Sequence, residues 1–163
     1  MALIVAPAAG AESYISVADA TAYHAARGNA AWAALPDDTA REQKLRIATD
    51  FMGQLYGSRW KGSRVSAAQT LDWPRYGVCS NGFPVDSTIV PVAVANACAE
   101  LALRAIDGDL APDLGAQVKQ ETVGPISVTY ADGARQQVAY QSVDGMLRPY
   151  LSGSANQIKL VRG

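Results

Sequence analysis

The sequence predicts a mainly α protein: a small helical-bundle core with a β-hairpin insertion and extended terminal arms. Two segments, near residues 39–56 and 91–106, repeat apolar residues at three- and four-residue spacing, which is typical of helices. Residues 118–140 are instead rich in Val, Ile, Thr and Tyr, which favours strands. The length of 163 residues fits one domain. We expect an arm at 1–12, a domain at 13–151 with its hairpin at about 117–140, and a tail at 152–163.

The first helix is predicted by its two ends. Ser16 and Asp19 form a capping box, in which Ser16 accepts a hydrogen bond from a free amide of the first turn. The helix then runs to Arg27, and Gly28 is a natural left-handed stop. Residues 29–36 are expected to form a connection that contains Trp32.

A second helix is predicted to begin at residues 37–39 and to end between Tyr56 and Trp60. Charged residues occupy one side of it, and an apolar face occupies the other. The apolar face consists of Leu45, Ala48, Met52 and Leu55. This pattern makes it the clearest amphipathic helix of the chain.

Residues 57–90 are predicted to be irregular, because glycine and proline recur throughout them. The segment also contains Trp60, Trp73 and Tyr76. Aromatic side chains in a long loop must pack on something, so we expect the loop to wrap over the core of the domain. An alternative uses the same aromatics, interleaved with Arg59, Lys61, Arg64 and Arg75, as a platform for stacking single-stranded bases.

A third helix should begin at Pro91 and run through Ile106, with Gly108 as its stop. Its polar residues, Asn96, Glu100 and Arg104, form one stripe at four-residue spacing. Almost all its other positions are apolar. We therefore expect the central helix of the core, which could also contribute to a subunit interface.

The last third of the domain changes to strand character. Residues 118–123 and 126–130 should form two strands separated by Gly124-Pro125, and residues 136–140 could pair back after the turn Asp132-Gly133. Ser142 is expected to cap a short helix that reaches about Leu151. The segment Gln157 to Arg162 follows a flexible linker and is either a frayed end or a strand that adds to a partner.

Composition excludes several classes of function. The formal net charge of −1 provides no global positive field for nucleic acid. The longest apolar run, residues 90–106, is interrupted by polar residues and does not predict a membrane span. With two cysteines, one histidine (His24) and no nucleotide or zinc motif, the chain is not expected to be an enzyme or to bind a metal or cofactor. This profile favours an assembly protein.

Six stretches carry a resemblance to a known family. The most specific is Gln69-Thr70-Leu71-Asp72-Trp73-Pro74-Arg75. It is followed by Val90-Pro91-Val92-Ala93-Val94 and Ala97-Cys98-Ala99-Glu100-Leu101-Ala102-Leu103. The opening Ser13-Tyr14-Ile15-Ser16-Val17-Ala18-Asp19-Ala20 also matches, as do residues 48–51 and 60–62. The chain resembles tailed-phage head–tail connector proteins, also called adaptor or head-completion proteins. Some members carry a label that likens them to a DnaT-like, primosomal single-strand-binding protein.

The resemblance implies a virion protein with a helical core, made in the cytoplasm of the host bacterium and placed at the head–tail interface. It implies a homo-oligomeric, dodecameric ring beneath the portal protein, with a tail-completion or stopper protein on the other side. Genomic DNA would pass through the lumen without sequence-specific binding, and no membrane, catalysis or cofactor is implied. The rival is a single-stranded-DNA-binding replication protein.

Two contact sites follow as hypotheses, and one motif is assigned to structure. We expect the portal to be bound by Gln157, Ile158, Lys159, Leu160, Val161 and Arg162. We expect a tail-side or inter-subunit contact through Lys119, Glu121, Val123, Ile126, Val128 and Tyr130. The structural motif is Gln69, Leu71, Trp73, Pro74 and Arg75, with Trp73 buried, Pro74 fixing a turn, and Arg75 bound to carbonyls or a carboxylate.

Overall fold

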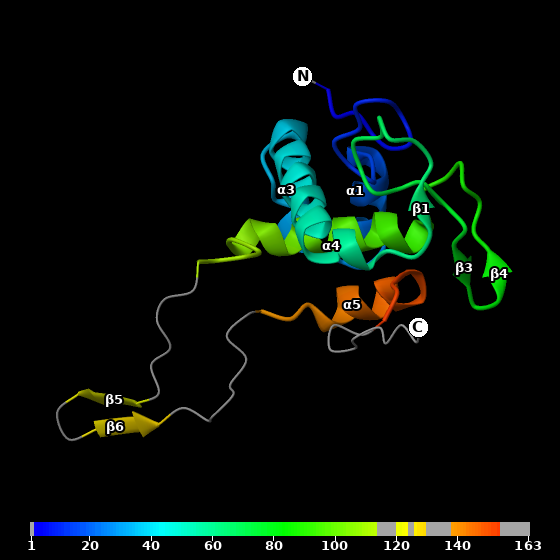
Figure 1. The fold of residues 1–163 in the computed structure, drawn as a ribbon. Coiled ribbons are helices and arrows are strands. Elements are labelled where there is room, and N and C mark those ends of the chain that lie inside the picture. Colours follow the sequence, from blue (N-terminus) through cyan, green and yellow to red (C-terminus); the bar gives the residue numbers. More distant parts are fainter. Residues whose placement is uncertain (1, 114–119, 124–125, 130–137, 154–163) are drawn as a thin grey trace, which may run out of the picture.

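The computed structural model describes residues 2–113 and 138–153 in full, and the backbone of residues 120–123 and 126–129 (Figure 1). The α-helices of this part of the chain are α1 (Val17–Ala25), α2 (Ala30–Ala33), α3 (Asp38–Tyr56), α4 (Val92–Asp107) and α5 (Gln141–Leu147). Two 3-10 turns, η1 (Gly57–Arg59) and η2 (Arg148–Tyr150), follow α3 and α5. The prediction of a mainly α fold is confirmed.

Helix α4 is the centre of the core, as its sequence predicts. It contacts α1, α2, α3 and α5, and α3 crosses it with the most extensive contact (Figure 1). Four alanines of α4 are buried, so the helices packed on it can approach closely. The fully buried side chains Leu45 and Met52 of α3 fill the space between the two helices.

The predicted helix starts hold for α1 and α3. The Ser16 hydroxyl accepts a hydrogen bond from the Asp19 amide at 3.0 Å, and the Asp37 carboxylate accepts one from the Ala40 amide at 2.8 Å. The predicted short last helix is present as α5 and η2, but the assignment of Ser142 as its cap was wrong. Ser142 lies inside α5, and its hydroxyl accepts a hydrogen bond from Arg104 Nη2 at 2.8 Å, so it is not free to cap the helix.

Two further expectations need correction. The connection at 29–36 contains the short helix α2, which places Trp32 in the core, with its indole N–H donating to the Thr21 hydroxyl at 3.0 Å. Leu55 shares the apolar spacing of α3 but is 41% exposed. Leu55 instead lines an open groove together with Leu110 and Val138.

The first residues fold against the body. The Leu3 amide donates to the Glu42 carboxylate at 3.2 Å, and Val5 forms a parallel bridge with Ser13. Arg46 on α3 then pairs with Glu12 at 2.9 Å. Residues 2–12 are thus held by α3 and by the segment that leads into α1.

The strands form two-stranded antiparallel sheets. Strand β1 (Ser63–Arg64) pairs with β2 (Arg75–Tyr76), β3 (Cys79–Ser80) with β4 (Phe83–Pro84), and β5 (Gln120–Val123) with β6 (Ile126–Thr129). The β5–β6 pair, with Val123 opposite Ile126, stands away from the helices (Figure 1), and both strands lie within the predicted strand segments. Of the segment 136–140 that was predicted to pair back, residues 138–140 belong to no strand, which corrects that prediction, and residues 136–137 lie outside the described residues. No described helix is long and apolar enough to cross a membrane.

Candidate functional site

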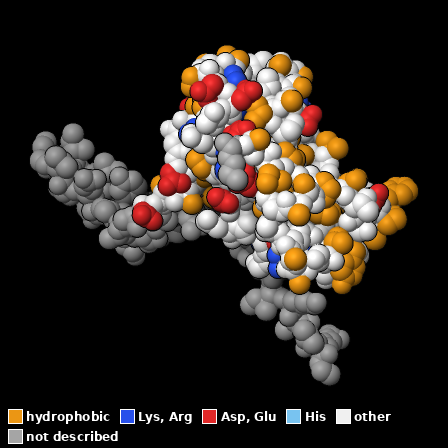
Figure 2. Space-filling model, turned by 90° about the horizontal axis from the view of Figure 1, so that it is seen from above, with side chains coloured by type: hydrophobic (Ala, Val, Ile, Leu, Met, Phe, Trp, Pro, Cys, Tyr) orange, Lys and Arg blue, Asp and Glu red, His pale blue; other side chains and the backbone are white. Residues whose placement is uncertain are grey.

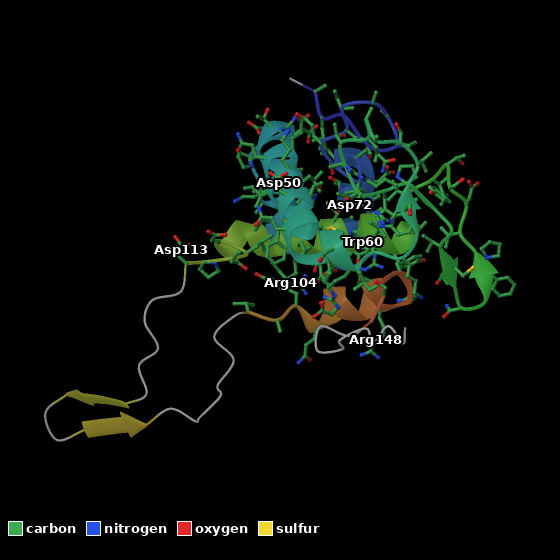
Figure 3. All side chains as sticks on the ribbon, viewed as in Figure 1. Asp50, Trp60, Asp72, Arg104, Asp113 and Arg148 are labelled. Carbon is green, nitrogen blue, oxygen red and sulfur yellow. The ribbon has the colours of Figure 1, made fainter. Side chains whose placement is uncertain are left out.

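The aromatic residues of the 57–90 loop lie inside the protein. Trp60 is 5% exposed and Trp73 fully buried. Their rings meet edge to face, with centroids 5.6 Å apart, and Trp73 makes a similar contact with Tyr150 at 5.7 Å. Figure 3 shows Trp60 within the body. Base stacking needs an exposed ring face, so these two indoles offer no stacking platform.

The motif Gln69, Leu71, Trp73, Pro74 and Arg75 ties this loop together through its backbone. Arg75 is 8% exposed and donates to the carbonyl oxygens of Lys61, Asp72 and Gly62 at 2.8, 3.2 and 2.8 Å. The Gln69 amide donates to the carbonyl oxygens of Leu71 and Pro74 at 2.7 and 2.9 Å. Burial lowers the pKa of Arg75, and its carbonyl contacts satisfy the donors of the guanidinium.

The other cations of the loop also bind the protein itself. Lys61 Nζ donates to the Pro149 carbonyl oxygen at 2.7 Å, and Arg64 donates to the Gln69 carbonyl oxygen at 3.0 Å. The guanidinium of Arg59 lies 5.7 Å from the centroid of the Tyr56 ring. Among the aromatic and basic residues of the alternative base-stacking platform, Arg64 and Tyr76 are exposed, with an exposed fraction of 55% for Tyr76. One exposed ring beside one cation is a small surface for a strand of nucleic acid.

His24 is a buried structural residue. Its Nε2 lies 3.1 Å from the Ala99 carbonyl oxygen, and its Nδ1 lies 3.0 Å from the side-chain amide nitrogen of Asn29. A neutral ring that carries its proton on Nε2 satisfies both contacts, and burial lowers the pKa of His24. Cys98 is fully buried against the Thr49 hydroxyl at 3.3 Å, and burial raises the pKa of its thiol. Neither group is open to a substrate.

No cluster of three or more His, Cys, Asp or Glu side chains that could hold a metal ion occurs among the described residues.

The structure adds an apolar surface that the sequence interpretation missed. Hydrophobic side chains gather at the end of the molecule that carries β3–β4 (Figure 2). Phe83 is 76% exposed and Val92, at the start of α4, is 74% exposed. The signal for the protruding hairpin was Asn81-Gly82, since both residues have positive φ (52° and 84°), as a two-residue type I′ turn requires.

Comparison with protein families gives one result that covers residues 1–163. The matching family model is described as "Putative DnaT-like ssDNA binding protein". The chain belongs to this family. No curated protein and no solved structure matches the chain significantly. The match supports the DnaT-like label within the resemblance, whereas the head–tail connector function stays a prediction.

The two predicted contact sites of this DnaT-like family member fall largely beyond the described residues. Residues 157–162, Lys119 and Tyr130 lie outside them. In the β5–β6 register, Glu121 pairs with Val128 and Val123 with Ile126, while the alternate pairs, Gln120–Thr129 and Thr122–Ser127, are wholly polar. The register thus sets the backbone positions of four predicted contact residues opposite one another.

Proposed function

We propose that this protein is a structural virion component, a head–tail connector that forms a ring beneath the portal, joins the capsid to the tail and lets genomic DNA pass. One observation carries the proposal. Trp60, Trp73 and Arg75, the core of the candidate nucleic-acid platform, are buried in the fold, while large apolar side chains such as Phe83 and Val92 are exposed. Exposed apolar side chains in a group are typical of protein–protein contact surfaces.

Charge supports the same proposal. The formal net charge of the chain is −1, so the channel of a ring of such chains would attract the DNA backbone only weakly. A strongly basic ring would retain the passing genome by counterion release, whereas a conduit must let it slide. A connector also needs neither a cofactor nor a catalytic group, in keeping with His24 and Cys98 serving the core.

The portal contact is assigned to Gln157, Ile158, Lys159, Leu160, Val161 and Arg162, and the tail-side or inter-subunit contact to the β5–β6 hairpin. Both are alternating segments joined to the domain by linkers, which suits strand addition to a partner. The remaining partner is a tail-completion or stopper protein, and the place of action is the head–tail interface of the virion.

The deciding experiment mixes the purified protein with its cognate portal and measures mass by light scattering and sedimentation. A complex of ring stoichiometry is expected with the full chain, and a chain ending at Ser152 should keep its circular dichroism and melting temperature but lose the complex. A chain with residues 157–162 in scrambled order is the matched control for length and charge. Normal portal attachment by the truncated chain would refute the tail assignment, and no complex with the full chain would refute the connector function.

A second candidate function, binding of single-stranded DNA in replication, is favoured by the description of the family. It is tested by fluorescence anisotropy of a labelled oligo-dT over a series of salt concentrations. Tight binding that weakens steeply with salt, and that falls in Tyr76→Ala and Arg64→Ala, would favour this function. The connector proposal expects weak binding that these substitutions leave unchanged.

A further inference from the structure

The β3–β4 hairpin ends in an apolar protrusion. Phe83 and Pro84 of β4 are both exposed, and the exposed fraction of Phe83 is 76%. We call Phe83 and Pro84 the apolar tip. Strand β3 contacts η2, so the hairpin is fixed to the body at its base while its end stands out (Figure 1).

An apolar groove lies at the other end of the molecule. Its volume is about 390 Å3, and its walls are Phe51 and Leu55 of α3, Leu110 and Pro112 after α4, and Val138 before α5. Leu55 is 41% and Val138 58% exposed, so the groove presents unpartnered apolar surface. One wall is rigid, since the ring of Phe51 packs edge to face on Tyr140 with centroids 5.6 Å apart.

The charges around the two features are opposite. The exposed Asp113 lines the groove, and the exposed Asp107 and Asp109 lie in the segment just before its wall residue Leu110; none of the three forms an ion pair within the described residues. The basic residue Arg148 belongs to η2, beside β3, and Lys61 donates to the carbonyl of the next residue, Pro149. Figure 3 shows Asp113 and Arg148 on different sides of the body, Asp113 where the chain leaves toward β5.

The tip and the groove cannot meet within one molecule. They lie near opposite ends of α4, a helix of 16 residues, or about 24 Å at 1.5 Å per residue. A second copy of the chain supplies the missing partner for each, with the matching charge. Copies joined in this way use two different surfaces, and such a head-to-tail contact builds a ring where the rotation between copies closes and an open filament where it does not.

We infer that the apolar tip of one copy inserts into the groove of the next copy, with Phe83 against Phe51 and Leu55 and with Arg148 facing the acidic rim. This inference rests on the proposed function, because it names the surface through which the ring would form. It assigns the inter-subunit contact to residues 51–55, 79–84 and 110–113, in addition to the β5–β6 hairpin.

Chemical cross-linking between copies tests the contact directly. Cys79 of β3 is exposed and Cys98 is buried, so a short bis-maleimide reacts with one native thiol per chain. Ala111→Cys adds a second thiol at the groove. Head-to-tail contact should give a ladder of dimers, trimers and larger species on a denaturing gel. Gln43→Cys, exposed on α3 but remote from the groove, is the matched control and should give no ladder.

The second arm removes the tip. Phe83→Asp in the Ala111→Cys chain should abolish the whole ladder, dimers included, while Val65→Asp, at a position 50% exposed and outside both surfaces, should leave the ladder intact. Circular dichroism of both chains checks that they are folded.

The outcomes separate this inference from the proposed function. The tip-and-groove contact is overturned if Ala111→Cys gives no ladder. It is also overturned if Gln43→Cys gives a ladder as well, or if the ladder survives Phe83→Asp. If light scattering still finds a ring on the portal, the connector function stands and uses another surface. A specific ladder from a protein that fails to bind its portal supports the contact and refutes the connector function.

Discussion

The Nη2 of Arg75 donates to the carbonyl oxygen of Gly62 at 2.8 Å, and its Nε donates to the neighbouring carbonyl of Lys61 at the same distance. One guanidinium thereby joins the segment after α3 to the segment after Trp73. The planar fork of arginine suits two adjacent acceptors, which the single ammonium of lysine cannot match. Arg75 is thus a structural residue, although it lies in the most basic and aromatic part of the sequence.

Arg75→Ala is expected to lower the free energy of unfolding by about 2 to 4 kcal/mol, because buried carbonyls lose charged donors. Arg75→Lys should recover only part of the loss. Urea denaturation followed by circular dichroism measures both. Arg64→Ala is the matched control, since Arg64 is exposed and makes one bond to Gln69, and it should cost less than about 1 kcal/mol. Equal effects at the two arginines would contradict the assignment.

Gly62→Ala should be among the most damaging small changes in the loop. A Cβ at this position would collide with the Tyr76 carbonyl oxygen, and Gly62 has a φ of +66°. Strain and clash together should cost about 3 kcal/mol. Gly77→Ala shares the positive φ of +71° but meets nothing within 4 Å, so about 1 to 2 kcal/mol is expected. The melting temperatures of the two variants separate the cost of the steric clash from the cost of backbone strain alone. Equal melting temperatures would contradict the close approach at Gly62.

Intrinsic fluorescence should report a protein whose tryptophans are all buried. Trp32, Trp60 and Trp73 are the three tryptophans of the chain, with exposed fractions of 1%, 5% and 0%. We expect blue-shifted emission, weak quenching by iodide and no change on adding oligo-dT. Denatured protein is the control for full quenching. Strong quenching of the folded protein by oligo-dT would show bases stacked on an indole and would count against the buried loop.

The stability of the protein should depend on pH through His24. Burial lowers its pKa below the ordinary 6.5, so the unfolded chain binds this proton more readily than the folded chain. Stability is therefore complete above pH 6.5 and falls as pH drops below it, by at most about 1.4 kcal/mol per pH unit. Urea denaturation at pH 7.5 and 5.5 measures the difference.

His24→Gln is the control for this pH dependence, because His24 is the only histidine of the chain. The variant should lose stability at pH 7.5 but show little further change at pH 5.5. An equally steep fall in the variant would assign the effect to carboxylates such as Glu100, which accepts hydrogen bonds from Tyr23 and Arg104.

Local patterns predicted most of the helical core. The capping residues Ser16 and Asp37 and the apolar spacing of α3 and α4 act within one or two turns, so they can be read from the chain itself. The central place of α4 also followed from its composition, since a helix with one narrow polar stripe must be covered on its other sides.

Long-range contacts decided what the sequence could not predict. Leu55 has the spacing of a core residue but is exposed, because no other element covers it fully. Ser142 resembles a cap, but Arg104, far away in the chain, binds its hydroxyl. The groove joins residues from α3, from the segment after α4 and from Val138. No local pattern reports that these segments meet.

The bridge between Trp60 and Leu151 has a mechanical consequence. Beside it, the Lys61 amide donates to the Tyr150 carbonyl oxygen at 2.9 Å, and the Ser152 amide and hydroxyl donate to the Arg59 carbonyl oxygen at 2.7 and 2.8 Å. Any tension applied through the residues beyond Gly153 enters the body at this clasp, next to the paired indoles. Several hydrogen bonds would therefore share that load before α5 was pulled from the core.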